Sequence, residues 1–382
     1  MKVAIVGAGI FGLSAAVALR ERGHEVVVFE QGTVPNPRAS STDTSKTIRR
    51  LYGDNATYVE LAERAAATWR RWNERLGGTI YFPIGQIQIE RNFRPGARIY
   101  DSWQFLHDRG EVQILSVREA RARYPQFTYL DGDTVLFDPW GGYLASGEAV
   151  AGVARIARED GVVILDESPV RAIEDAGTAA RIVSGDASIA FDRVVAAAGV
   201  WLTRLVPSVG CHIRPTFQEM VFFEPENREL FQPGPMPVWA VCPEEDGWYG
   251  HPLWRGGWIK VANDLRGPEV DPDADRSVTH GFVAGAKEFV ARRIPELAGA
   301  RVAGKRACLY ENTPDRHFVI DWAPGSERVL VAGGGSGHGF KFGGSIGPVI
   351  ADALEDKPNR LGDLFRIGSR FATGKREFRT GG

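Results

Sequence analysis

The chain has 382 residues, 43% hydrophobic and 25% charged, which is typical of a globular protein with room for two domains and a sizeable core. A formal net charge of −2 leaves no basic field for nucleic acid and no polybasic patch for a membrane surface. The three cysteines are widely spaced, which argues against a disulfide framework. No long apolar run predicts a membrane span, and no signal-peptide pattern predicts secretion. We therefore expect a cytoplasmic protein.

Residues 1–30 match the βαβ unit that binds dinucleotides. An apolar strand at 2–6 leads into Gly7-Ala8-Gly9-Ile10-Phe11-Gly12, a helical pattern follows, and a second strand ends at Glu30. The glycines permit a tight turn, close approach to a pyrophosphate and packing of the helix on the strand, and Glu30 is placed to accept hydrogen bonds from the adenosine ribose. FAD and NAD both use this unit. Its N-terminal position and the terminal glutamate favour FAD.

Hydrophobic periodicity and turn residues predict the later elements. After a polar segment at 33–57, these are, in chain order, a helix at 58–76, an alternating strand at 80–90, helices at 116–124 and 147–159, a strand at 162–165, an apolar strand at 192–201, several strands within 213–262, a helix at 277–294, a strand at 328–332 and a helix at 345–354. Ser116 and Glu119 have the spacing of a capping box at the start of their helix.

This order of elements predicts an α/β fold built from two domains. A Rossmann-type FAD-binding domain is assembled from the discontinuous segments 1–79, 143–207 and 300–382. An α+β substrate-binding domain with an antiparallel sheet is inserted as segments 80–142 and 208–299.

Four blocks along the chain resemble the monomeric sarcosine oxidase family, within the D-amino-acid oxidase-like flavoproteins. They are the glycine fingerprint, Ile48-Arg49-Arg50-Leu51-Tyr52-Gly53, the region from Cys308-Leu309-Tyr310 through Thr313-Pro314-Asp315-Arg316-His317 to Asp321, and Gly337-His338-Gly339-Phe340-Lys341-Phe342. The resemblance spans nearly the whole chain. It implies that Cys308 forms a thioether to the 8α-methyl group of FAD.

The resemblance also implies roles for the charged residues. Arg49 and Lys341 match positions that bind the substrate carboxylate, a task suited to the planar fork of arginine and the point charge of lysine. Lys260 lies among strand residues, where an unused charge is unfavourable, and corresponds to the lysine above the flavin that assists oxygen reduction. Tyr249 and Tyr310 match tyrosines of the substrate pocket. His338 corresponds to a histidine near the flavin, and a purely structural role for it stays open.

Two positions depart from the family pattern. Lys46 stands where the family commonly has an arginine, and Asp264 stands where sarcosine oxidase itself has a histidine. A carboxylate in place of a substrate-facing imidazole favours a different amine, larger or more cationic than sarcosine. We therefore expect Lys260, Arg49, Lys341, Tyr249, Tyr310, His338, Asp264 and Lys46 at the catalytic site.

The cofactor site is expected to include the fingerprint and the glycine-rich blocks. The candidates are Gly7, Ala8, Gly9, Ile10, Phe11, Gly12, Glu30, Gln31, Ser45, Thr47, Val170, Gly199, Trp201, Cys308, Gly337, Gly339, Phe340 and Lys341. No metal site is expected, because the remaining histidines are scattered without ligand spacing.

The leading hypothesis is an FAD-dependent oxidase that converts a secondary amine bearing a carboxylate into an imine and reduces O2 to hydrogen peroxide. The substrate candidates are N-methyl amino acids, cyclic amino acids and fructosyl or other conjugated amino acids. One alternative is a flavin dehydrogenase with a different electron acceptor, against which Lys260 argues. A nicotinamide-dependent dehydrogenase and a non-catalytic flavin-binding module are the others. We expect a monomer with small-molecule partners only.

Overall fold

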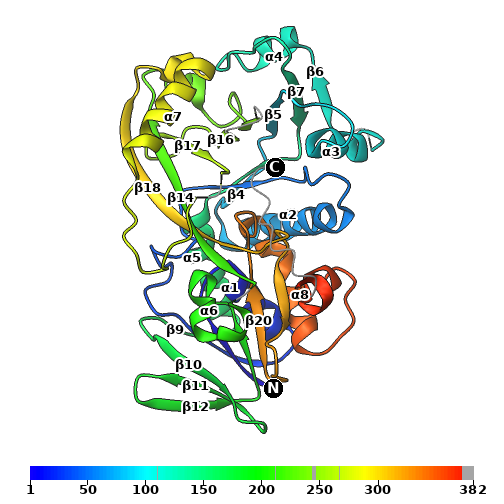
Figure 1. Cartoon of the computed structure of the whole chain (residues 1–382), viewed down its shortest axis with the longest axis vertical. Coiled ribbons are helices and arrows are strands. Elements are labelled where there is room, and N and C mark those ends of the chain that lie inside the picture. Colours follow the sequence, from blue (N-terminus) through cyan, green and yellow to red (C-terminus); the bar gives the residue numbers. More distant parts are fainter. Residues whose placement is uncertain (110, 211, 243–246, 266, 372–382) are drawn as a thin grey trace.

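The computed structural model describes residues 1–109, 111–210, 212–242, 247–265 and 267–371, so Cys211 lies outside the described residues. The molecule is elongated, with one large sheet near each end of its long axis (Figure 1). The lower end in Figure 1 carries the N-terminal unit, and the upper end carries the central part of the chain. This arrangement matches the predicted α/β class. The predicted domain boundaries stay a prediction.

A six-stranded sheet forms the lower end, and the sequence predicts its centre correctly. Its order is β19 (Val319–Trp322), β20 (Val329–Gly333), β13 (Arg193–Ala196), β1 (Lys2–Val6), β2 (Glu25–Phe29) and β9 (Val163–Leu165). All neighbours run parallel except β19 and β20. Helices α1 (Ile10–Glu21), α5 (Ser146–Glu159) and α8 (Gly343–Leu354) contribute to its largest hydrophobic core. The inner strands are apolar on both faces, as buried parallel strands require.

An eight-stranded sheet forms the upper end. Its order is β18 (Arg301–Asn312), β14 (Arg214–Glu224), β17 (Ile259–Asn263), β16 (Trp248–Gly250), β15 (Val238–Cys242), β5 (Gln86–Glu90), β7 (Thr134–Asp138) and β6 (Gln113–Leu115). The expectation of a purely antiparallel sheet is wrong at one place, because β5 and β15 pair in parallel. No hairpin joins these two strands, since all the elements from α3 (Arg98–His107) to β14 lie between them in the chain, so no tight turn imposes an antiparallel pairing.

Helices α3 (Arg98–His107), α4 (Val117–Arg123) and α7 (His280–Arg293) belong to the same end as this sheet (Figure 1). The predicted helix at 277–294 is therefore α7, and the predicted helix at 116–124 is α4. The capping box at Ser116 is confirmed, because its hydroxyl accepts from the Glu119 amide while the Glu119 carboxylate accepts from the Ser116 amide.

Two three-stranded sheets and two further helices complete the fold. They are β3 (Lys46–Ile48), β8 (Gly142–Leu144) and β4 (Tyr81–Phe82); β10 (Val170–Asp175), β11 (Ala180–Ser184) and β12 (Ala187–Phe191); and α2 (Ala56–Leu76) and α6 (Leu202–Leu205). The sequence does not predict β10–β12. The single strand expected at 80–90 is wrong, because the chain turns between β4 and β5 at Pro83 and at Gly85, whose φ is 82°.

Across the described ranges, none of the helices combines the length and the apolar character needed to cross a bilayer. The longest helix, α2, is instead amphipathic and has defined ends. Asn55 caps its N-terminus by accepting from the Tyr58 amide, and Gly77 ends it in the left-handed conformation with φ 62°.

Helices α1 and α8 pack closely enough that only glycine fits at their contact. A Cβ at Gly347 of α8 would overlap the backbone carbonyl of Ser14 in α1, and a Cβ at Gly344 would overlap the backbone of Ala65 in α2. The Ser14 hydroxyl also bridges the two helices, accepting from the Gly347 amide at 3.0 Å and donating to the Gly343 carbonyl. The position of α1, and with it the fingerprint turn, depends on this contact.

We therefore predict that Gly347→Ala lowers the free energy of unfolding by about 2 kcal/mol or more, because the helices must separate to admit the methyl group. Urea unfolding followed by circular dichroism measures the change. Gly281→Ala in α7 is the matched control, since no atom lies within 4 Å of the added Cβ. It should leave the stability unchanged or slightly raised. Equal effects of the two substitutions would contradict close packing of α1 on α8.

Candidate active site

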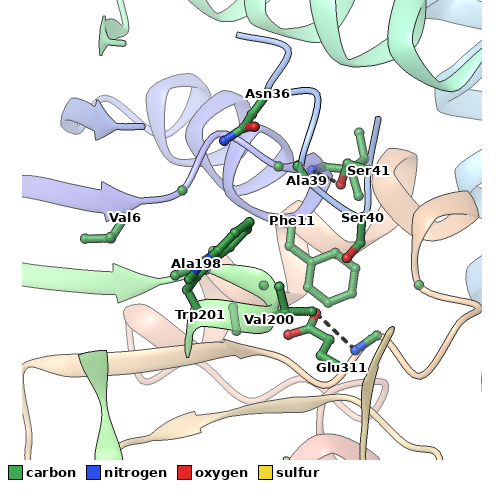
Figure 2. Close-up of a pocket in the computed structure, with 18 of the residues that line it drawn as sticks. Val6, Phe11, Asn36, Ala39, Ser40, Ser41, Ala198, Val200, Trp201 and Glu311 are labelled. Carbon is green, nitrogen blue, oxygen red and sulfur yellow. Dashed lines mark hydrogen bonds between the residues drawn. The ribbon is translucent and has the colours of Figure 1, made fainter. Parts of the chain in front are cut away.

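A first cavity runs along the carboxyl edge of the six-stranded sheet and encloses about 1060 Å³ of empty space, part of it open to solvent. Figure 2 shows Asn36, Ser40 and Ser41 on one side of it and Val200 and Trp201 on another. The cavity lies where a doubly wound sheet binds its ligands. Twelve of the predicted cofactor residues line it: Gly7, Gly9, Ile10, Phe11, Glu30, Gln31, Val170, Gly199, Trp201, Gly337, Gly339 and Phe340.

The glycine fingerprint has the geometry that a dinucleotide requires. Gly7 has φ 104°, and a Cβ there would clash with the backbone of Ala197. A Cβ at Gly12 would overlap the Gly7 carbonyl, so Gly12 packs the helix on the turn and does not line the cavity. Helix α1 starts after Gly9, which carries no side chain to cap it. The Ser41 hydroxyl accepts from the Ile10 amide at 3.0 Å, so a phosphate at this helix N-terminus would bind beside Ser41 or replace it as the acceptor.

Glu30 is fixed as a hydrogen-bond acceptor at the end of β2. Its Oε2 accepts from the Ala8 amide at 2.9 Å, and its Oε1 accepts from the Gly32 amide at 3.1 Å and the Asn36 side chain at 2.9 Å. Ala8 therefore supports the site through Glu30 and does not line the cavity. The remaining lone pairs of the carboxylate are available to ribose hydroxyls. The glycine turn, the N-terminus of α1 and the Glu30 carboxylate fit a dinucleotide such as FAD.

Glu311 is a second acid on the wall of the first cavity, and the sequence does not single it out. Its Oε1 accepts from the Gly335 amide at 3.2 Å, whereas its buried Oε2 has no hydrogen-bond partner among the described residues (Figure 2). Burial raises the pKa of Glu311 to about 7, and the backbone N–H groups of Gly335 and Gly334 offset only part of this rise. A polyhydroxyl chain in the cavity would supply the donor that Oε2 lacks.

A second and larger cavity, with about 1940 Å³ of empty space on the same measure, opens between the two ends of the molecule. All eight predicted catalytic residues line it: Lys46, Arg49, Tyr249, Lys260, Asp264, Tyr310, His338 and Lys341. They come from segments far apart in the chain, including β3, β16, β17, β18 and the turn before α8. The structure therefore brings the predicted catalytic set together.

The two cavities share one wall. Lys46, Tyr310, Gly337 and Phe340 line both of them. A ligand in the first cavity therefore borders a ligand in the second at these four residues. This junction is the place where a cofactor ring and a substrate would meet.

Cys308 lies buried next to this junction and lines neither cavity. Its thiol lies 4.0 Å from the carbonyl oxygen of Ser40, which lines the first cavity, and Tyr310 follows it by two residues on β18. Cys308 and Cys242 are both free thiols. The Cys308 thiol is therefore close to the junction of the two cavities but separated from the first cavity by Ser40.

Lys260 is held by a buried carboxylate that the sequence analysis misses. Its ammonium lies 2.5 Å from Asp43 Oδ2 and donates to the Ser45 carbonyl at 2.9 Å, and Lys46 lies 3.4 Å from the same Asp43 oxygen. Burial alone would raise the pKa of Asp43, but Lys260 and Lys46 outweigh it and hold the pKa well below its usual range. Burial lowers the pKa of Lys260 despite Asp43.

His251 joins this cluster to the cofactor candidates Ser45 and Thr47. Its Nδ1 meets the Ser45 hydroxyl at 2.5 Å and its Nε2 meets the Thr47 hydroxyl at 2.9 Å. Ser45 therefore supports Lys260 from behind the cavity wall, and Thr47 lines the second cavity and not the first. Burial, followed by the charge of Lys260, lowers the pKa of His251 well below its usual value, so this histidine is neutral.

The half-buried Arg49 and the buried Lys341 differ from the buried cations Arg50, Lys260 and Arg293, since neither has a carboxylate partner among the described residues. Arg49 lies with its guanidinium 4.5 Å from the centre of the Tyr52 ring. Lys341, also a predicted cofactor residue, is 4% exposed and donates only to the His338 carbonyl at 2.7 Å. Burial, followed by the nearby charge of Arg49, lowers the pKa of Lys341 well below its usual value. An anion in the cavity would relieve both effects.

His338 lines the second cavity, but protein groups occupy both of its ring nitrogens. Nε2 lies 2.9 Å from the Arg316 carbonyl and so donates to it, and Nδ1 therefore accepts from the Tyr52 hydroxyl at 3.2 Å. Burial, followed by the charge of Lys341, lowers the pKa of His338 well below its usual value. The ring is a neutral, oriented part of the wall. Tyr249 and Tyr310 face each other nearby, with hydroxyls 3.5 Å apart.

Asp264 does not act as the free anion that its sequence position suggests. Its carboxylate pairs with Arg316 at 3.3 Å at the mouth of the second cavity. Arg316 offsets part of the charge that Asp264 offers to a ligand, and the expectation of a larger or more cationic amine stays a prediction.

Comparison with known proteins gives a consistent picture. A family model described as DAO, FAD dependent oxidoreductase, matches residues 2–353. N-methyl-L-tryptophan oxidase of Yersinia pestis (strain Pestoides F) is 28% identical, with 94% of this chain and 95% of the relative covered. In fold, L-proline dehydrogenase from P. horikoshii has a TM-score of 0.86 at 20% identity, covering 99% of both chains. Fructosamine oxidase (Amadoriase II) from Aspergillus fumigatus has a TM-score of 0.84 at 23% identity, covering 100% of this chain and 93% of its own. The chain belongs to the FAD dependent oxidoreductase family.

The raised pKa of Glu311 predicts a pH dependence of stability for the flavin-free protein. The folded state holds a proton that the unfolded chain releases, so its contribution is present below about pH 4.5 and is lost as the pH rises to about 7. Glu311→Gln carries no charge, so it should be more stable than the parent by about 1–3 kcal/mol at pH 8 and differ little at pH 4.5. Urea unfolding at both pH values measures the difference.

Glu226→Gln, which replaces an exposed acid, is the control for the Glu311 experiment. It should change the stability by a small and pH-independent amount. If Glu311→Gln and Glu226→Gln gave the same pH profile, the carboxylate of Glu311 would not be the protonated group.

Proposed function

We propose that this protein oxidises the C–N bond of a secondary amine that carries a carboxylate, with O2 as the electron acceptor. The observation that carries the proposal is the pair of cations without carboxylate partners, Arg49 and Lys341, on the wall of the cavity that meets the cofactor cavity. Buried cations are rarely left without an anion. A substrate carboxylate is the anion that best completes this site.

The names of the related proteins support this substrate class. N-methyl-L-tryptophan, L-proline and a fructosamine share a nitrogen bonded to carbon on both sides. The substrates in the names of these relatives differ widely in size. They therefore support a secondary amine as the reacting group and do not indicate the rest of the substrate. N-methyl, cyclic and fructosyl or otherwise conjugated amino acids therefore all stay candidates.

The protein residues would bind and orient the substrate. FAD, when bound, supplies the two-electron acceptor for oxidation of the amine to an imine, which water then hydrolyses. Arg49 and Lys341 would hold the carboxylate, fixing the adjacent C–H bond toward the wall shared by the two cavities. His338 would stay neutral, because both of its nitrogens are engaged. Tyr249 and Tyr310 would close the side of the cavity next to Lys260.

Lys260 supports O2 as the acceptor. It is a buried ammonium on the cavity wall, and a fixed cation stabilises negative charge as it develops on reduced oxygen. Asp43 neutralises part of this charge, so the cluster as a whole, with Lys46, carries one net positive charge from two lysines and one carboxylate. The alternative is a dehydrogenase that uses another carrier. Slow reoxidation of the substrate-reduced enzyme by air would favour it.

We also propose that Cys308 forms a thioether to FAD. Its burial beside Ser40 and Tyr310, at the junction of the cavities, supports this assignment. Segments 1–79, 143–207 and 300–382 would form the FAD-binding domain, and segments 80–142 and 208–299 the substrate domain. The free thiols of Cys242 and Cys308 suit a reducing, cytoplasmic location, and we propose a monomer.

The central test is reduction of the bound flavin by N-methyl amino acids without oxygen, followed by admission of air. We predict bleaching of the visible absorbance, recovery in air and release of hydrogen peroxide. Arg49→Gln should lower kcat/KM by about 30- to 100-fold, because it removes a charged hydrogen bond to the carboxylate. The same substitution should have a much smaller effect on an N-methyl amine that lacks a carboxylate. Equal losses on both substrates would contradict the assignment of Arg49.

The thioether predicts that yellow colour stays with the polypeptide after precipitation in acid, and that Cys308→Ala releases it to the supernatant. Cys242→Ala is the matched control, since Cys242 is the other described free thiol, and it should retain the colour. Absorbance of pellet and supernatant measures the result. Release of the flavin from the unaltered protein would overturn the thioether and leave the proposed reaction intact.

A further inference from the structure

The second cavity holds more positive charge than one substrate carboxylate requires. Five cations line it, namely Lys46, Arg49, Arg98, Lys260 and Lys341, against the two acids Glu90 and Asp264. Asp43 pairs with Lys46 and Lys260, and Asp264 pairs with Arg316. Arg49, Arg98 and Lys341 then have no carboxylate within 4 Å among the described residues. Arg98 is the one of these three to which neither the sequence analysis nor the proposed function gives a role.

Arg49 and Arg98 converge on a single neutral acceptor. Both guanidinium groups donate to the backbone carbonyl of Leu51, Arg49 at 2.5 Å and Arg98 at 3.0 Å. A carbonyl dipole does not neutralise two full charges, and two like charges at one acceptor repel each other. The neighbouring Arg50 shows the usual arrangement, since it is buried and pairs with Asp138, Glu63 and Glu111. Unlike Arg50, Arg49 and Arg98 therefore leave positive charge that an added anion could neutralise.

The helix that carries Arg98 adds to the positive potential. Arg98 is the first residue of α3, and Ala97, Arg98 and Ile99 all line the cavity. The N-terminus of a helix is positive, so an arginine there adds to the positive potential. The acid in the same turn, Asp101, accepts from the Gly96 amide at 3.1 Å and forms no ion pair with Arg98 among the described residues. Much of the Arg98 side chain is accessible to solvent, because it faces the open cavity. A ligand in the cavity can therefore reach it.

The remaining acid nearby does not neutralise this charge. Glu90 accepts from the Asn92 amide at 3.1 Å, and no cation lies within 4 Å of it among the described residues. Burial raises the pKa of Glu90, and the charge of Arg98 offsets this only in part. The other polar groups on this side of the cavity, Gln86, Gln88 and Asn92, are neutral.

We propose that the substrate carries a second carboxylate and that Arg98 binds it. The first carboxylate lies at Arg49 and Lys341, and the substrate class is an N-substituted dicarboxylic amino acid. This inference rests on the proposed function, and the C–N bond that is oxidised is the same. Neutral side-chain amides on the cavity wall, from Gln86, Gln88 and Asn92, complete a polar setting for the second carboxylate.

The first test measures binding without turnover. Glutarate, a dicarboxylate without an amine, should bind the holoenzyme at least 10-fold more tightly than butyrate, as measured by the change in flavin absorbance and by thermal shift. Arg98→Gln should reduce this ratio to less than about 3-fold. Arg118→Gln removes the same charge from an exposed site in α4 and should preserve the ratio. A glutarate-to-butyrate ratio near one in the unaltered enzyme would overturn the inference.

The second test compares N-methyl-L-glutamate with its neutral isostere N-methyl-L-glutamine. We expect kcat/KM to favour the diacid by 10- to 100-fold and Arg98→Gln to abolish the preference. Oxidation of both compounds at similar rates, unaffected by Arg98→Gln, would overturn the inference and leave the proposed function standing. Oxidation of neither compound, together with a retained preference for glutarate, would exclude these N-methyl amino acids as substrates and leave the second anion site standing.

Discussion

The buried carboxylate of Asp43 is the constraint on which the rest of the site depends. It pairs with both Lys260 of β17 and Lys46 of β3, and its backbone carbonyl accepts from Ser146 and Gly147 at the start of α5. Removing one member of such a buried ion pair typically destabilises a protein by several kcal/mol, because the partner is left charged and unpaired. One aspartate thus joins the polar segment after β2 to the upper sheet and to a helix of the lower end. Lys46, one of the two lysines paired with Asp43, belongs to the wall that the two cavities share.

Charge pairing divides the arginines and lysines of this site into two groups. Arg50, Lys46 and Lys260 have carboxylate partners from the protein, and their positions are settled by the fold. Within the part of the chain that the structure describes, Arg49, Arg98 and Lys341 have only neutral backbone acceptors. The first group stabilises the structure, and the second group is placed to be completed by a ligand. Adjacent residues such as Arg49 and Arg50 fall into different groups, so charge alone does not identify the function.

The sequence predicts the parts of the fold that local patterns determine. Continuous apolar strands, the glycine fingerprint and the capping box at Ser116 all have short-range signals, and each is found where expected. The resemblance to a known family gives eight catalytic candidates, and all eight line one cavity of the structure. The sequence does not predict a role for Asp43, Arg98 or Glu311, because their importance comes from partners distant in the chain or from burial. The parallel pairing of β5 with β15 and the ion pair of Asp264 with Arg316 depend in the same way on long-range contacts.

The position of Cys308 on a strand of the upper sheet has a consequence for how cofactor and protein depend on each other. A cofactor that is only bound stabilises the folded state by mass action, so the melting temperature rises with its concentration. A thioether from β18 would keep the cofactor on the chain through unfolding, and this concentration dependence would vanish. The cofactor would then be held covalently at the upper sheet and by non-covalent contacts at the lower end of the molecule. Dilution, which empties ordinary binding sites, would leave such an enzyme fully loaded.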